Sequence, residues 1–103
     1  MKTKVLTLLG FAQKSGNVVS GSEIVVKTID KGKVRLVFVG KDAAEGTTKK
    51  IILRCQRLNI PFYSELTVDE LSGAIGKHNR TVVAITDKGF ATQILSLISD
   101  MGI

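Results

Sequence analysis

Apolar residues recur along this chain with two periods, and the alternation of these periods predicts the fold. Helical spacing of three and four residues occurs at 3–14, 24–31, 49–58, 68–75 and 90–101. Nearly continuous apolar runs, typical of buried strands, occur at 34–40 and 81–86, and shorter strands are predicted at Pro61-Phe62-Tyr63 and Val18-Val19. Strands that alternate with helices need a sheet covered on both faces. We therefore expect one α/β domain, a three-layer α/β/α sandwich with a small mixed sheet.

Polar residues before three of these helices predict side-chain caps. Ser20 and Glu23 have the spacing of a capping box, and Ser22 is an alternative cap for the same helix. The segment Thr67–Glu70 repeats this spacing before the fourth helix. Thr47 or Thr48 is expected to cap the third helix.

One apolar face of each helix is expected to pack on the sheet. The five faces comprise Val5, Leu8, Leu9 and Ala12; Ile24, Val25, Thr28 and Ile29; Ile51, Ile52, Cys55 and Leu58; Leu71, Ala74 and Ile75; and Phe90, Ile94, Leu97, Ile98 and Met101. Because Cys55 lies on such a face, we interpret it as a core residue rather than a nucleophile.

Composition limits the classes of protein to which the chain can belong. Its 103 residues suffice for one domain, and 44% hydrophobic residues with 23% charged residues are typical of globular proteins. One cysteine and one histidine cannot form an internal disulfide or a Cys/His zinc site, and we expect no metal and no cofactor. The sequence contains no apolar run of about 18 residues and no signal-peptide cleavage site. We therefore expect a cytoplasmic protein without a membrane partner, with a monomer as the favoured state.

Charge is distributed unevenly along the chain, whose net charge is +6. Residues 1–50 contain ten basic and four acidic residues, whereas residues 51–103 contain five of each. A basic excess confined to one half suggests a polyanionic partner, most often nucleic acid. The alternative is that this charge serves solubility, and composition alone does not separate the two.

Catalytic chemistry has weak support in the sequence. Asp42, Glu45 and Asp87 follow predicted strands and His78 lies in a loop, where a general acid and base can be placed. However, no pair of them is set by spacing, and carboxylates after strands commonly cap helices. The chain also lacks the glycine patterns that bind nucleotide phosphates. We therefore expect that the protein is not an enzyme.

The start of the second helix is a candidate phosphate site. A helix N-terminus offers unpaired N–H groups and the positive end of the helix dipole, and Gly21 has no side chain to obstruct a nucleic-acid backbone. Lys27 lies one turn beyond Glu23, where it can contact phosphate or form an ion pair with Glu23. These residues alone leave an RNA site and a structural cap as alternatives.

Several motifs follow one another in the order found in a known family. They are Gly16-x-x-x-x-Gly21-Ser22-x-x-x-x-Lys27-x-x-x-x-Gly32, Leu36–Ala43, Asn59–Tyr63, Glu70–Lys77 and Val83–Phe90. Together they resemble the L-seven-Ae ribosomal-protein family, which includes the eukaryotic L-thirty-e protein, over nearly the whole chain. The loop Lys77–Arg80 and the segment Thr86–Ala91 most resemble the small bacterial YlxQ-type members.

This resemblance implies a non-catalytic RNA-binding protein with an α/β/α sandwich fold. The family binds the unpaired elbow of a kink-turn RNA through the start of the second helix and the loop before the last strand. Ribosomal RNA is a candidate target, and a ribosome or other ribonucleoprotein is a candidate assembly. Carried over by position, the expected RNA-binding residues are Gly21, Ser22, Glu23, Ile24, Lys27, Lys77, His78, Asn79 and Arg80. We add two basic residues near these segments in the sequence, Lys14 and Lys41, to the expected RNA-binding set.

The two positions that correspond to base-reading side chains depart from the family pattern. The family often has Asn-Glu or Lys-Gln where this chain has Glu23-Ile24. A glutamate can accept hydrogen bonds from the N–H edge of guanine, but an isoleucine side chain cannot form hydrogen bonds. The alternative function is therefore a protein-interaction module on the same fold that has lost specific RNA recognition.

Overall fold

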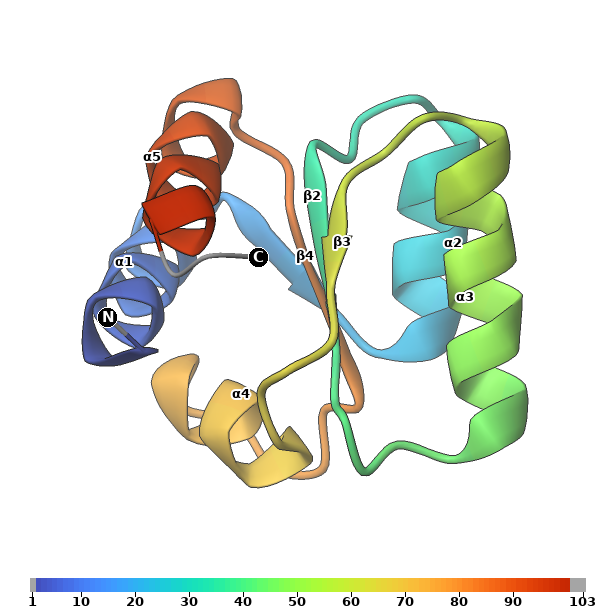
Figure 1. Ribbon diagram of the computed structural model, residues 1–103, viewed down its shortest axis with the longest axis horizontal. Coiled ribbons are helices and arrows are strands. Elements are labelled where there is room, and N and C mark those ends of the chain that lie inside the picture. Colours follow the sequence, from blue (N-terminus) through green and yellow to red (C-terminus); the bar gives the residue numbers. More distant parts are fainter. Residues whose placement is uncertain (1, 101–103) are drawn as a thin grey trace.

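The sheet forms the middle layer of the molecule, as seen edge-on in the computed structural model (Figure 1). The structure describes residues 2–100, in which the strands are β1 (Val18–Ser20), β2 (Leu36–Val39), β3 (Phe62–Tyr63) and β4 (Val82–Ile85). They lie in the order β1-β4-β2-β3. Strand β4 is antiparallel to both β1 and β2, whereas β3 is parallel to β2. The predicted mixed sheet is confirmed, and so is the short strand predicted at Val18-Val19.

Helices cover both faces of this sheet (Figure 1). On one face lie α1 (Lys2–Lys14), α4 (Val68–Ala74) and α5 (Lys88–Asp100), and on the other lie α2 (Ser22–Asp30) and α3 (Glu45–Arg57). The three-layer α/β/α sandwich is therefore confirmed. The expectation that Met101 extends the apolar face of the last helix falls outside the described residues. Within those residues, no helix combines the length and the apolar character needed to cross a membrane.

Alternate residues of the two central strands supply two separate cores. Leu36, Phe38, Val83 and Ile85 pack in the core beneath α1, α4 and α5. Their neighbours Val37, Val39, Val82 and Ala84 pack in the core beneath α2 and α3. Because successive side chains of a strand point to opposite faces, a strand covered on both faces must be apolar throughout. This geometry explains why the sequence shows continuous apolar runs here instead of alternation.

Two residues predicted to lie on packed helix faces are exposed instead. Val25 and Ile29, four residues apart on α2, are buried, but Ile24 is 52% exposed. Each residue turns the helix by about 100°, so Ile24 faces away from the row that Val25 and Ile29 form. Leu58 is 51% exposed because α3 ends at Arg57 and the backbone of Leu58 leaves the helical conformation. Cys55 is buried in the core beneath α2 and α3, as predicted.

Only one of the three predicted side-chain caps forms. The capping box of Thr67 and Glu70 is present at α4. Ser20, however, is the last residue of β1 and pairs with Val83, so its backbone belongs to the sheet and α2 begins after Gly21. Neither Ser20 nor Ser22 caps α2 through its side chain. Helix α3 begins at Glu45, before either threonine that was expected to cap it, and it also lacks a side-chain cap.

Candidate nucleic-acid interface

Three segments that are distant in sequence meet at one end of the sheet. Because β4 lies between β1 and β2 and is antiparallel to both, its first residues lie beside the last residues of its two neighbours. The Gly21 N–H donates to the Val82 carbonyl oxygen (2.9 Å), and the Gly40 N–H donates to the Thr81 carbonyl oxygen (2.8 Å). The start of α2, the loop Lys77–Arg80 and the residues after β2 therefore converge here.

The N-terminus of α2 is open. Gly21 precedes the helix with φ 95° and ψ 137°, a conformation that favours glycine because it has no Cβ. The first helical hydrogen bond runs from the Val25 N–H to the Gly21 carbonyl oxygen (2.9 Å). The N–H groups of Ser22, Glu23 and Ile24 therefore have no carbonyl partner within the helix. These amides and the positive end of the helix dipole are suited to an anion such as phosphate.

The side chains of the first turns of α2 are accessible to a ligand. Glu23, Ile24 and Lys27 are exposed and Ser22 is half-buried. The ion pairs among the described residues do not include one between Glu23 and Lys27. The structure therefore does not show the alternative arrangement, an ion pair between Glu23 and Lys27.

The loop Lys77–Arg80 is held beside Gly21 by a buried serine of α4. The Arg80 N–H donates to the Ser72 Oγ (2.8 Å), and Ser72 is only 4% exposed. A Cβ placed on Gly21 would lie 3.5 Å from the Arg80 Nη1. The Arg80 Nε is buried and has no hydrogen-bond partner among the described residues. This arrangement places a guanidinium against the open N-terminus of α2.

Sequence reasoning assigned no role to Ser72. The available signal was a small polar residue between the apolar positions Leu71 and Ile75, both of which are buried. A buried hydroxyl needs a hydrogen-bond partner, so a polar residue in such a place indicates an anchored backbone nearby. The partner itself, Arg80, becomes visible only in the tertiary structure.

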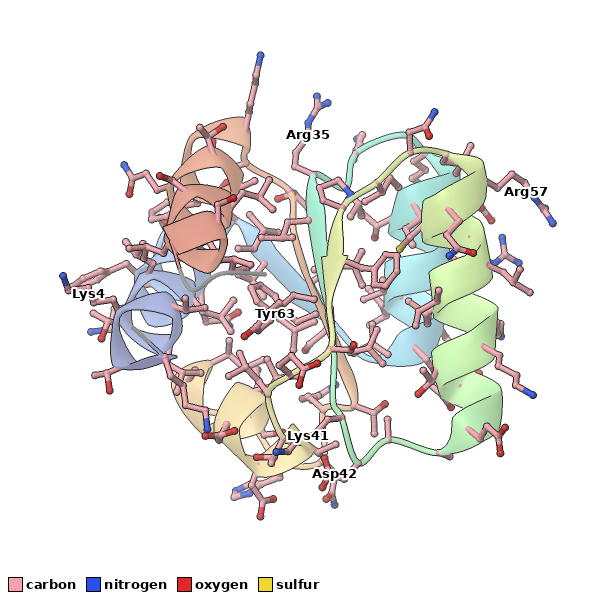
Figure 2. All side chains as sticks on the ribbon, in the orientation of Figure 1. Lys4, Arg35, Lys41, Asp42, Arg57 and Tyr63 are labelled. Atoms are coloured by element: carbon pink, nitrogen blue, oxygen red, sulfur yellow. The ribbon has the colours of Figure 1, made fainter. Side chains whose placement is uncertain are left out.

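The structure groups the predicted residues with one exception. Lys41 follows β2 at the end of the sheet opposite Arg35 (Figure 2), and its N–H donates to the Leu66 carbonyl oxygen (2.8 Å). Of the other predicted residues, Gly21, Ser22, Glu23 and Ile24 lie at the start of α2, Lys27 lies in its last turn, and the rest form the loop Lys77–Arg80, except Lys14. Lys14 instead ends α1 and lines a groove between α1 and α4.

The basic excess of residues 1–50 does not gather at this site. Lys31 and Lys33 follow the C-terminal end of α2, about 13 Å along the helix from its open start. Arg35 lies at the end of the molecule opposite Lys41, where Arg57 also projects (Figure 2). The site instead combines basic residues from both halves of the chain.

The carboxylates considered for catalysis have structural partners. Asp42 Oδ1 accepts a hydrogen bond from the Val68 N–H (2.8 Å) at the start of α4, and Asp87 Oδ2 accepts one from the Phe90 N–H (2.8 Å) at the start of α5. Glu45 pairs with Lys49 on α3 at 3.2 Å. A hollow of about 680 Å³ between α1 and α5 has Lys4 as its one ionisable lining residue within the described part of the chain. These observations favour helix capping over catalysis for Asp42 and Asp87.

Comparison with known proteins places this geometry in context. The model of the ribosomal protein L7Ae/L30e/S12e/Gadd45 family matches residues 3–95. The RNA-binding protein YlxQ of Bacillus subtilis (strain 168) is 38% identical over 91 residues, which cover 88% of this chain and 91% of that protein. The RNA-binding protein YlxQ of Enterococcus faecium is 33% identical over 97 residues, covering 94% and 93% of the two chains.

Two solved structures also resemble this chain. A Bacillus halodurans protein described as having unknown function superposes with a TM-score of 0.89 and 38% identity, covering 93% of this chain and 97% of that one. The Giardia lamblia 15.5kD RNA binding protein shares the fold, with a TM-score of 0.83, 17% identity and coverage of 95% and 87%. The resemblance inferred from the sequence motifs is confirmed, as is the expectation of a non-enzyme, because the chain belongs to the non-catalytic ribosomal protein L7Ae/L30e/S12e/Gadd45 family.

Proposed function

We propose that this chain, acting as a single domain over residues 1–103, binds RNA at the end of the sheet where the three segments converge. It recognises a kinked or partly unpaired element, with ribosomal RNA as a candidate target and a ribonucleoprotein as a candidate assembly. The observation that carries the proposal is the open N-terminus of α2 with the Arg80 guanidinium beside it. Similarity to two relatives named RNA-binding protein supports it.

Affinity in this proposal comes from the RNA backbone. A phosphate at the start of α2 accepts hydrogen bonds from the free amides, and Gly21 leaves room for it. Lys27, Lys41 and Lys77 are all exposed and can neutralise neighbouring phosphates. Each neutralised phosphate releases counterions, so binding weakens steeply as salt rises.

Selectivity comes from the two side chains that depart from the family pattern. Glu23 can accept hydrogen bonds from the N–H edge of a guanine, and the exposed Ile24 can pack against the face of an unstacked base. Side chains cannot read the deep, narrow major groove of a regular RNA helix, whereas bases in bulges and loops are splayed out. We therefore expect a bent element with unpaired bases to bind more tightly than a straight duplex.

A titration of fluorescently labelled RNA tests the proposal. The same strands are compared as a duplex with a kink-turn and as a fully paired duplex, at two salt concentrations, by anisotropy. The kinked RNA should bind more tightly, and Lys27→Ala should reduce the slope of log K against log salt by about one. Lys33→Ala is the matched control, because Lys33 is an exposed lysine beyond the opposite end of α2. Equal, weak binding of both RNAs by the wild type would contradict selective recognition.

The exposed Ile24 also supports a second candidate function. A large apolar side chain that is 52% exposed at the rim of a site is suited to a protein contact. In that case the chain is an interaction module that has lost specific RNA recognition. Affinity capture with and without nuclease distinguishes the two functions. A partner that survives nuclease and is lost with Ile24→Ser supports the protein contact, whereas a nuclease-sensitive partner supports RNA binding.

A further inference from the structure

We propose that the groove between α1 and α4 binds an unpaired nucleotide that continues from the RNA at the converging segments. Phe11 provides the face on which its base stacks, and Lys14 contacts a neighbouring phosphate. This inference rests on the proposed RNA-binding function and extends that site to a second surface.

Phe11 differs from the other aromatic residues of the chain in its exposure. Phe38 and Tyr63 are buried and meet edge to face with ring centroids 6.2 Å apart. Phe62 and Phe90 are partly buried against the two cores. Phe11 is 53% exposed, and among the described residues it is the one aromatic side chain on the open surface. An exposed aromatic ring offers the π-face on which unpaired bases stack regardless of their sequence.

The groove beside Phe11 is large enough for a nucleotide. It measures about 430 Å³, within the range of roughly 300–1,000 Å³ that small-molecule pockets occupy. Its sides come from α1, including Phe11 and Lys14, and from Gly73 and Gly76 at the end of α4. A Cβ on Gly10 would lie 3.1 Å from the Ala74 carbonyl oxygen. Gly10 therefore lets α1 approach α4 closely, whereas an added Cβ on Gly73 or Gly76 would meet no atom within 4 Å, so the groove is open beside them.

A second hollow connects this groove to the RNA site. It measures about 420 Å³ and lies between α4 and the loop residues Lys77, His78 and Asn79. Gly73 lines both hollows, and Gly76 of the first is followed directly by Lys77 of the second. The two hollows therefore adjoin along α4, on the way from the loop Lys77–Arg80 to Phe11.

The charges along this path favour a nucleic acid over an apolar protein segment. Lys14 is the one charged residue that lines the α1–α4 groove within the described part of the chain. It follows Phe11 by three residues on α1, so the two side chains lie on neighbouring positions of one helix face. The second hollow carries Lys77, opposed by Asp69. Surfaces that bind single strands combine aromatic side chains, on which bases stack, with basic residues that contact the backbone.

The test compares a kinked RNA that ends in paired nucleotides with the same RNA carrying a short single-stranded extension, placed at either strand end. One unpaired position holds 2-aminopurine, whose fluorescence is quenched on stacking. We expect the extension to tighten binding by about tenfold and to quench the probe. Phe11→Ala should remove both effects but leave binding of the RNA without extension unchanged, while Phe11→Tyr should retain them. Lys14→Ala should lower the salt slope by about one for the extended RNA alone.

Leu53→Ala is the matched control, because Leu53 is a large apolar residue of α3 that is 58% exposed. Phe11 and Leu53 are both surface residues, so neither variant should impair folding, which circular dichroism checks. An extension that adds no affinity, or a loss on Phe11→Ala that is equal for both RNAs, overturns the groove proposal while RNA binding stands. Failure of the wild type to bind either RNA overturns the proposed function and the groove together.

Discussion

Helices α2 and α4 differ in how the free backbone N–H groups at their N-termini are capped. At α4 the Thr67 Oγ1 accepts from the Glu70 N–H (3.0 Å), and Glu70 Oε1 accepts from the Thr67 N–H (2.9 Å). Asp42 accepts a third hydrogen bond, from the Val68 N–H. Among the described residues no side chain caps α2, and the start of this helix lies beside Arg80.

Electrostatics strengthens the contrast. Lys2 Nζ lies 2.6 Å from Glu70 Oε2, and this ammonium together with the Thr67 N–H lowers the pKa of the Glu70 carboxyl to about 2. The positive end of α4 is therefore balanced by two carboxylates of the protein itself, Glu70 and Asp42. Helix α3 also begins without a side-chain cap, so an open start is not sufficient to mark a site. What distinguishes α2 is the basic loop packed against it.

The largest effect is expected from Gly21→Ala. An alanine at φ 95° is strained, and we expect the free energy of unfolding to fall by about 1–3 kcal/mol, with weaker RNA binding. Urea unfolding and RNA titration measure the two effects. Gly46→Ala is the matched control, because Gly46 lies in helix α3 with no atom within 4 Å of an added Cβ. Alanine there should preserve or raise stability. Equal stability of the two variants would show that the backbone conformation at position 21 does not require glycine.

Removing the hydroxyl at the start of each helix should separate effects on the free energy of unfolding from effects on RNA affinity. Thr67→Ala removes the cap of α4 and should lower the free energy of unfolding by about 1 kcal/mol without changing RNA affinity. Ser22→Ala removes a hydroxyl that makes no capping bond, so it should leave stability unchanged. Thermal unfolding and RNA titration of both variants provide the readouts. A loss of stability with Ser22→Ala, equal to that with Thr67→Ala, would mean that α2 is capped after all.

The smallest effect is expected from Glu70→Gln, which keeps an acceptor for the capping box but removes the charge. Because the folded pKa of Glu70 is about 2 and thus below its unfolded value, its charge stabilises the fold above the unfolded pKa. This contribution is lost as pH falls from about 4.5 toward 2. Since the pair with Lys2 is partly exposed, the difference at neutral pH should be below about 1 kcal/mol. Unfolding curves from pH 6 to pH 2 should converge for the two proteins, and parallel curves would contradict the assignment.

Signals that depend only on nearby residues predicted the fold well. The order of helices and strands, the short strand at Val18-Val19 and the capping box of Thr67 and Glu70 all rest on periods and spacings within one segment. The family motifs added the approximate location of the candidate site, because they identify the start of α2 and the loop Lys77–Arg80 as the segments expected to bind RNA. The predicted elements and the predicted capping box agree with the structure because contacts between distant segments do not oppose these local signals.

Two predictions failed because contacts with distant segments opposed a local signal. Ser20 has the spacing of a cap, but pairing with Val83 places its backbone in the sheet. Ile24 fits an apolar face by spacing, but Val25 and Ile29 occupy the row that faces the core. In both cases pairing or packing with a distant segment, which the local spacing does not show, decided the outcome.

The sequence by itself determined the alternation of helices and strands, the continuous apolar strands with a core on each face, and the family. Burial of apolar residues at regular spacing is a local property of the chain, and it needs no knowledge of partners. Only the tertiary structure decided which segments form the site. The antiparallel placement of β4 between β1 and β2 brings Gly21, Arg80 and Lys41 to one end, and Ser72 holds the loop there. Hydrogen bonds between strands set that arrangement, and they join residues that the sequence separates by tens of positions.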